Sequence, residues 1–381
     1  KIKERTKEME PSLIPPASAT LIGIPVIWLS ILVPLCGIVL FVYIVKQRSA
    51  PLVAAAPDPR FQQLKERLVA VIKFALVQYR QPRYRLAGVL HILLFAGFVM
   101  LSIRSITLVI TGFVESFHFP GLGGGLGIGY GLVKDLAATV VLGTCVVATV
   151  RRGIFKPERY AVPQKYGKDH AAEAVFVLMM ISGLMISDAL FEGSLAAAAF
   201  GKGHPSEIMI PLTLKAVAAG MLSNVDLSAL QTIHVISYLA HELIFFSFLC
   251  FLPFGKHFHV ITSFPNVFFL KLEKGSVKPV QWQVEEAEVE RLETIGVKKY
   301  EDFTWKHVLD FYSCADCGRC SDNCPANAVG RPLSPRFISI KCRDYAFGKY
   351  PVFGRPAPAQ DLMGDVLEPD EIWSCTTCGA C

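Results

Sequence analysis

The first two thirds of the chain alternate between long apolar stretches and short polar segments, and this pattern predicts a membrane protein. A helix that crosses a bilayer needs about 20 mainly apolar residues. Five stretches reach that length, whereas segment 208–222 is shorter and carries a proline and a lysine. We interpret that segment as an interfacial or re-entrant helix. The five predicted spans are residues 21–45, 86–113, 132–150, 171–190 and 229–253.

Three other segments are defined by their polar residues. Residues 64–79 mix basic and apolar side chains, which is typical of an amphipathic helix lying on a membrane surface. The glycine-rich segment 121–131 fits no register of a G-x-G-x-x-G nucleotide loop and joins two predicted spans, so we expect a turn there. Residues 271–381 have no long apolar run and predict a soluble domain.

The basic residues of the connecting segments predict the orientation, because Lys and Arg accumulate in cytoplasmic loops. Segment 46–85 carries nine Lys/Arg and segment 151–170 carries six. Segment 114–130 carries none and segment 201–228 only two. We therefore expect a multi-pass protein of the cell's inner (cytoplasmic) membrane. Its N-terminus lies outside and its C-terminal domain lies in the cytoplasm.

Composition supports this prediction. The 381 residues are 52% hydrophobic, with a mean hydropathy of +0.43, which is too apolar for an ordinary soluble enzyme. The net charge of +6 reflects the basic residues of the connecting segments and gives no sign of nucleic-acid binding. Membrane lipid is the partner that this composition predicts.

Seven of the 11 cysteines lie in two tight runs near the C-terminus. C-x-x-C-x-x-C spacing lets consecutive thiolates hold three corners of one 4Fe–4S cluster, and a final Cys-Pro ligates the other cluster. By this logic Cys324 completes the second cluster. The fourth ligand of the first would lie about four residues past Cys381, so both chain ends are interpreted as cut. The predicted ligands are Cys314, Cys317, Cys320, Cys324, Cys375, Cys378 and Cys381.

A structural zinc site is the main alternative for these cysteines. Zinc sites favour two separated C-x-x-C pairs, whereas these are triple runs and the first ends in proline, which favours clusters. Cys36, Cys145 and Cys250 lie in predicted spans, where we expect small buried side chains. Cys342 is assigned no role.

Histidine is costly inside a bilayer, so intramembrane histidines are candidate ligands. His91 lies on the second predicted span, and His234 and His241 lie on the fifth, with His257 and His259 just beyond it. At about 1.5 Å per residue, His91 lies about 9 Å from the cytoplasmic boundary and His241 about 18 Å from the outer end.

The hydrocarbon core of a bilayer is about 30 Å thick, so these depths let His91 pair with either His241 or His259 around a haem b. His234 is seven residues from His241 and is expected on the same helix face. A hydrogen-bonded helix contact is the alternative role for any single histidine. One or two haem groups are therefore predicted.

Among the polar residues inside predicted spans, we single out Arg104, Asp188 and Glu242. We expect them to pair within the bundle. Their alternative role is proton handling at a quinone site, since a quinone takes up protons as it is reduced.

The membrane half resembles the gamma subunit of respiratory nitrate reductase over residues 19–270. The segment LPFGKHFHVITSFPN (252–266) is similar to the end of that family's fifth helix. The resemblance implies that His259 ligates the cytoplasmic-side haem together with His91.

By the same resemblance, His241 matches the fifth-helix ligand of the outer haem. The family's second ligand on helix two would fall ten residues after His91, where this chain has Leu101. Either the outer haem is lost or its partner lies elsewhere, and His234 is an additional candidate.

Beyond residue 300, the segments YEDFTWKHVLDFYSCADCGRCSDNCPA, GRPLSP and EIWSCTTCGAC resemble heterodisulfide-reductase-like iron–sulfur oxidoreductases. The two halves together resemble membrane-bound electron-transfer-flavoprotein:quinone oxidoreductases. That resemblance implies electron-transfer flavoprotein as donor and menaquinone as acceptor, with a further cysteine-rich domain after Cys381.

The expected fold is an all-α membrane protein in which a five-helix bundle precedes a cytoplasmic two-cluster ferredoxin-like α-helical domain. We divide it into a tail (1–18), a cytochrome b domain (19–270), a linker (271–300) and a ferredoxin-type domain (301–381). The preferred function is quinone-linked electron transfer. The alternatives are a sulfur- or disulfide-linked oxidoreductase, and a non-catalytic conduit and anchor of a larger respiratory complex.

Overall fold

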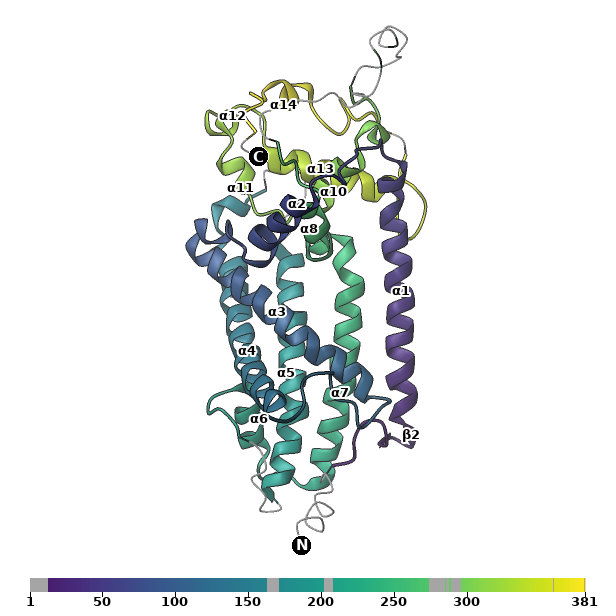
Figure 1. The fold of residues 1–381 in the computed structure, drawn as a ribbon, viewed down its shortest axis with the longest axis vertical. Coiled ribbons are helices and arrows are strands. Elements are labelled where there is room, and N and C mark those ends of the chain that lie inside the picture. Colours follow the sequence, from purple (N-terminus) through teal and green to yellow (C-terminus); the bar gives the residue numbers. More distant parts are fainter. Residues whose placement is uncertain are drawn as a thin grey trace. The chain divides into compact units, whose positions relative to one another are not determined.

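The computed structural model describes residues 13–162, 171–201, 208–273, 285, 288, 296–358, 360–379 and 381. Five helices in this part of the chain are long and apolar enough to cross a membrane, which confirms the predicted number (Figure 1). The only sheet in the same residues is the two-residue hairpin β1 (Thr20–Leu21) and β2 (Ile24–Pro25). The predicted all-α fold class is therefore confirmed.

The five long helices are α1 (Val26–Ala54), α3 (Arg85–Thr111), α4 (Gly124–Val150), α5 (Ala171–Gly201) and α7 (Leu227–Phe251). The shorter helices are α2 (Leu64–Ala70), α6 (Leu214–Leu222), α8 (His259–Phe268), α10 (Trp305–Tyr312), α11 (Arg319–Asp322), α12 (Pro325–Ala328), α13 (Pro335–Lys349) and α14 (Pro369–Trp373). The remaining helical turns are η1 (Val71–Leu76), η2 (Gln81–Arg83), η3 (Arg151–Phe155), η4 (Glu158–Tyr160), η6 (Leu252–Phe254), η7 (Lys256–Phe258) and η8 (Tyr300–Asp302).

Two sequence predictions were wrong. Residues 124–131 of the glycine-rich segment form the first turns of α4, so only its first three residues lie in the connection. A helix satisfies its backbone hydrogen bonds internally, which in an apolar setting outweighs the entropic cost of glycine. Cys36 is exposed, because only part of the α1 surface packs against other helices, whereas Cys145 and Cys250 are buried as expected.

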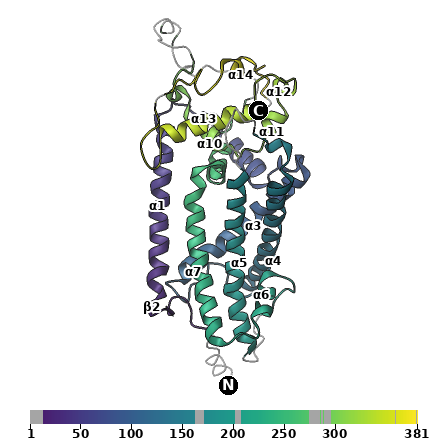
Figure 2. The same ribbon diagram turned by 180° about the vertical axis from the view of Figure 1, so that it is seen from behind.

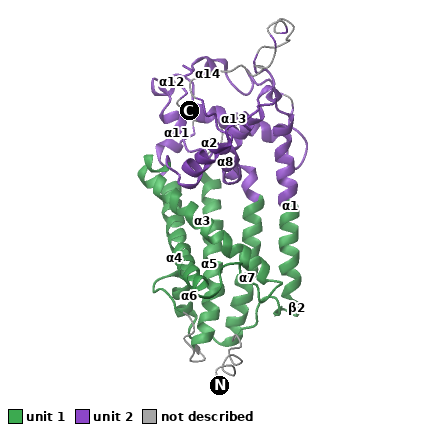
Figure 3. Ribbon diagram, in the orientation of Figure 1, with its two compact units in different colours: residues 1–40, 81–155, 170–250 green, residues 41–80, 156–169, 251–381 purple. Residues whose placement is uncertain are grey.

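The chain divides into two compact units, shown in Figure 3. Unit 1 contains residues Lys1–Leu40, Gln81–Phe155 and His170–Cys250. In it α4 packs between α3 and α5, and α6 lies against α4 and α5, as both ribbon views show (Figures 1 and 2). At Gly97 an added Cβ would lie 2.1 Å from the Val141 side chain, so glycine allows α3 and α4 to approach closely.

Unit 2 contains residues Phe41–Arg80, Lys156–Asp169 and Phe251–Cys381. Its core packs α8, α10 and α13 together around buried aromatic side chains such as Tyr300 and Tyr312. Thr304 caps α10 with a capping box. The domain boundaries inferred from sequence stay a prediction. Residues 1–12 of the tail and most of the linker lie outside the described residues.

Candidate iron–sulfur and electron-transfer site

The first cysteine run occupies the loop and short helices that follow α10. Asp316 and Gly318 both have positive φ, +55° and +76°, so the run contains two residues in the left-handed region. Cys324 is the N-cap of α12 and is followed by Pro325 at the first helical position, where proline is well tolerated. The C-x-x-C-x-x-C spacing therefore folds into a tight wrap, and Cys-Pro ends it by starting a new helix.

The thiols of each run are electrostatic neighbours. Burial, and after it the neighbouring Cys314 and Cys317 thiols, raises the pKa of the Cys320 thiol to about 12. The pKa of the Cys381 thiol is raised first by partial burial, and then by the two other cysteines of its run and by Cys324. Cys324 and Cys320 therefore both lie near Cys381 of the second run. Crossed ligation would use Cys324.

The two cysteine runs have the chemistry that 4Fe–4S clusters require. Each run offers soft thiolate ligands at the C-x-x-C-x-x-C spacing that binds such clusters. Within the described ranges, no three His, Cys, Asp or Glu side chains converge closely enough to hold a single metal ion. The assignment of individual ligands stays a prediction.

Arg336 of α13 joins the first cysteine run to η4 and the residue that follows it. Its Nε pairs with Asp316 Oδ1 at 2.5 Å, and both side chains are almost fully buried, at 5% and 2% exposed. Its Nη atoms donate to the backbone carbonyls of Arg159 and Ala161 at 3.0 Å and of Tyr160 at 3.2 Å. One guanidinium therefore satisfies a buried carboxylate and three carbonyls of a distant segment.

Gly318 allows the first cysteine run to approach Arg159 closely. A Cβ at this position would lie 2.7 Å from Arg159 Cγ and 2.9 Å from the Arg159 carbonyl oxygen, in addition to the strain of its positive φ. The second run is positioned differently: Lys341 Nζ of α13 pairs with Glu371 Oε2 of α14 at 2.7 Å, and Cys375 lies two residues after the end of α14. Helix α13 thus anchors both runs.

His259, the first residue of α8, fits axial haem ligation. Its Nδ1 lies 2.6 Å from the Lys256 carbonyl oxygen and must donate to it, which leaves the lone pair on Nε2. Metal-ligating histidines are commonly oriented in this way. His91 is half-buried in α3. The two residues belong to different units, so their pairing stays a prediction.

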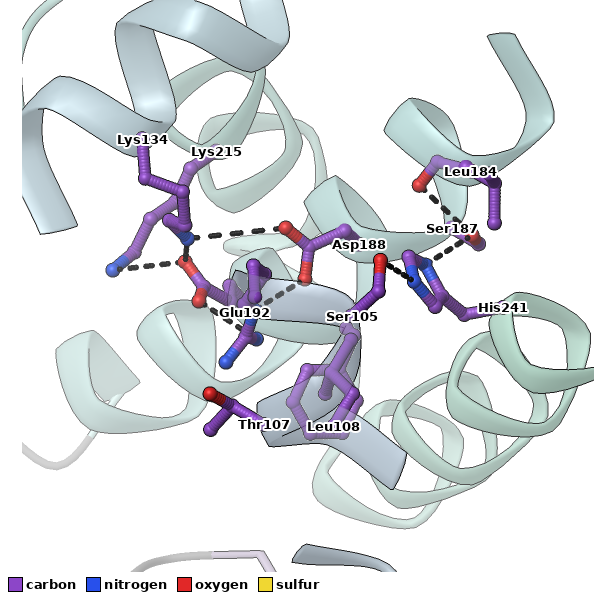
Figure 4. Close-up of polar contacts among 12 residues, drawn as sticks. Ser105, Thr107, Leu108, Lys134, Leu184, Ser187, Asp188, Glu192, Lys215 and His241 are labelled. Carbon is purple, nitrogen blue, oxygen red and sulfur yellow. Dashed lines mark hydrogen bonds and ion pairs between the residues drawn. The ribbon is translucent and has the colours of Figure 1, made fainter. Parts of the chain in front are cut away.

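His241 and His234 both contact α5, as expected for residues on one face of α7. His241 Nδ1 lies 3.2 Å from Ser187 Oγ and its Nε2 lies 3.2 Å from Ser105 Oγ, so it links three helices (Figure 4). His234 Nδ1 lies 3.0 Å from the Phe191 carbonyl oxygen, and its ring stacks on Phe191. Because His234 Nδ1 faces a carbonyl oxygen, its Nε2 is the nitrogen that would bind haem iron. Both His241 nitrogens already have serine partners in this structure.

The predicted intramembrane pairing is confirmed for Arg104 and Asp188, whose Nε and Oδ1 lie 2.9 Å apart. Arg104 also pairs with Glu192 at 2.8 Å, and Lys134 reaches the same carboxylate at 2.6 Å (Figure 4). Sequence reasoning missed four members of this network: Lys134, Asp135, Glu192 and Lys215. The four-residue spacing of Asp188 and Glu192 on one helix was the available signal.

Glu242 differs from the other two charged candidates. Its side chain is fully buried in α7, and neither carboxylate oxygen has a hydrogen-bond partner among the described residues. A buried carboxyl without a partner is costly in its charged form. Pairing within the bundle therefore does not account for Glu242.

Membrane-length apolar helices joined to a cysteine-rich α-helical domain define a class of membrane iron–sulfur proteins. The family model "4Fe-4S dicluster domain" matches residues 313–381, which include all seven cysteines of the two runs. The C-terminal part of the chain is therefore a 4Fe–4S dicluster domain.

The chain is 28% identical over 390 residues to "Probable iron-sulfur-binding oxidoreductase FadF" of Bacillus subtilis, an alignment that covers 93% of this chain and 52% of the relative. It is 27% identical over 395 residues to "EtfAB:quinone oxidoreductase" of Syntrophomonas wolfei, covering 94% and 52%. A shorter match, 37% over 106 residues, is to "Probable membrane-anchored ferredoxin" of Chromohalobacter salexigens, covering 23% and 16%.

The chain thus spans about half the length of the two curated relatives that it matches along most of its own length. No solved structure matches it. The dicluster domain and the membrane-length helices indicate a membrane protein with a 4Fe–4S domain.

Proposed function

We propose that this protein transfers electrons from reduced electron-transfer flavoprotein, through two 4Fe–4S clusters and haem b, to menaquinone in the membrane. The observation that carries this proposal is the presence of membrane-length helices and a dicluster domain in one chain that aligns over 94% of its length with an EtfAB:quinone oxidoreductase. The loop charges support a cytoplasmic position for the cluster domain. Bound clusters and haem supply one-electron carriers.

The protein's own residues position those carriers. Arg336 fixes the first cysteine run, and the Lys341–Glu371 pair fixes the helix before the second. His259 and His91 are the proposed haem pair, with His241 and His234 as further candidates. Neutral, hydrogen-bonded imidazoles suit this role because the second ring nitrogen fixes the tautomer.

The proposal is tested with the full-length protein in lipid vesicles that contain a menaquinone analogue. Reduced flavoprotein is added, and cluster reduction and quinol formation are followed separately. We expect both, with quinol formation abolished in the Cys317→Ala variant. Cluster reduction without quinol would overturn menaquinone as acceptor, and absence of cluster reduction would overturn the flavoprotein as donor. Activity of the isolated chain would exclude the non-catalytic conduit.

Replacement of His259 by alanine is expected to remove one b-type haem, because the variant lacks the imidazole whose Nε2 carries the lone pair. Haem content per protein and the reduced-minus-oxidised optical spectrum measure this loss. His257→Ala is the matched control, since its ring lies only 6.2 Å from that of His259. Haem loss in the control with full haem in His259→Ala would reverse the ligand assignment.

A further inference from the structure

A pocket of about 440 Å³ lies within unit 2, between the last turns of α1 and the segment that follows α13. Tyr43 and Gln47 line it from α1, and Lys349, Tyr350 and Phe353 line it from the other side. Its volume falls in the range of small-molecule sites, about 300–1,000 Å³. The pocket borders α1, which has the length and composition of a membrane span.

One wall of the pocket is aromatic. The Tyr43 and Phe353 rings stack with centroids 5.9 Å apart and an interplanar angle of 30°. Phe353 also stacks on Phe254 at 6.2 Å and 14°. The Tyr43 hydroxyl donates to the Val352 carbonyl at 3.2 Å, which fixes the segment that carries Phe353. Phe353 is nevertheless 60% exposed, so part of this aromatic wall is open to a ligand.

The segment that carries Phe353 also carries groups that exchange protons. Lys349 Nζ pairs with Glu301 Oε1 at 2.7 Å, and the Tyr350 hydroxyl donates to the same carboxylate. Lys349 and Glu301 are both partly exposed, which connects the pair to water. An ammonium, a phenol and a carboxylate in contact form a short chain along which protons can move from solvent to the pocket.

The pocket wall also continues into the protein core next to the first cysteine run. Arg48 donates to the Tyr350 carbonyl, and its guanidinium lies 3.6 Å from the centroid of the Phe347 ring. Phe347 contacts the buried ring of Tyr312 at 5.5 Å, and Tyr312 precedes Cys314 by two residues. Packed side chains therefore fill the space between the pocket wall and the cysteines.

We propose that this pocket binds the head group of a membrane quinone, an inference that rests on the proposed function. The ring stacks on Phe353, and Lys349 donates a hydrogen bond to one quinone oxygen. Reduction adds two electrons, supplied through the bound carriers of the proposed function, and two protons, which enter through Glu301 and Tyr350. Both carbonyl oxygens become hydroxyls, and no other bond breaks.

The experiment uses the full-length protein in vesicles, with dithionite as reductant and a menaquinone analogue as substrate. Phe353→Ala is expected to raise KM for the analogue about tenfold, since a lost aromatic contact is worth about that factor. Lys349→Gln is expected to lower kcat by about 100-fold. Phe61→Ala and Lys298→Gln, at an exposed ring and an exposed lysine outside the pocket, are the controls and should match the wild type.

Iron content is measured in every variant, and Phe353→Leu, which keeps an apolar side chain of similar size, provides a second test if Phe353→Ala does not fold. A photoreactive quinone analogue should label residues 349–356 and be displaced by unlabelled menaquinone. Wild-type quinol formation with unchanged KM in the Phe353 variants, or labelling that only lipid displaces, would overturn the pocket while leaving the proposed function intact. Absence of quinol formation by the wild type would overturn the proposed function itself.

Discussion

Replacement of Cys320 by alanine is expected to remove the first 4Fe–4S cluster and about half of the bound iron. Each cluster needs four thiolates, and Cys320 is the third of its run. Because electrons must pass through every carrier, quinol formation driven by reduced flavoprotein should fall at least about 100-fold. Iron and acid-labile sulfide per protein, together with electron paramagnetic resonance of the reduced protein, measure the loss.

Cys36→Ala is the matched control, because Cys36 is exposed on α1 and lies in neither run. It should keep full iron content. Cys324→Ala separates the two clusters: crossed ligation predicts that it alters the signal of the second cluster rather than the first. Unchanged iron in Cys320→Ala, or stoichiometric zinc in the wild type, would contradict the cluster assignment.

Replacement of Arg336 by methionine is expected to destabilise the first cysteine run by about 3–5 kcal/mol. The change preserves length but leaves the buried Asp316 carboxylate without its charged partner, which is the costly way to break a buried ion pair. Three carbonyls of residues 159–161 also lose their donor. The measurement is the temperature at which the visible cluster absorbance bleaches, compared with the wild type.

Arg331→Met is the control, since Arg331 is exposed on the same domain. The bleaching temperature of Arg336→Lys should lie between those of Arg336→Met and the control. The lysine ammonium keeps the positive charge but lacks the planar guanidinium that reaches several acceptors. Bleaching of Arg336→Met at the temperature of the control would show that the cysteine run holds its shape without this contact.

Local patterns predicted much of this protein. Apolar length alone gave the correct number of spanning helices, since the requirement of about 20 residues is a property of each segment. The cysteine spacing predicted the dicluster domain for the same reason, because one loop carries three ligands. The glycine-rich start of α4 was misjudged, because glycine propensities from water do not hold in an apolar setting.

The partners of charged residues required the tertiary structure. Arg104 was noticed in the sequence, yet its partner Asp188 lies 84 residues away and Lys134 lies on another helix. The Arg336 contact joins residues 177 positions apart. No periodicity links such positions, because these contacts depend on how helices pack and not on the spacing within any one of them.

The sequence by itself therefore determined that this is a five-span helical protein with an iron–sulfur domain. Apolar length and thiol spacing act within single segments, so they can be read along the chain. Only the tertiary structure decided which buried charges neutralise one another, that Arg336 holds the first cysteine run, and that the end of α1 and the segment after α13 enclose a pocket. These features form where segments that are distant in the sequence pack together. The energy of a buried ion pair or aromatic stack depends on all the groups packed around it, and no single segment specifies those groups.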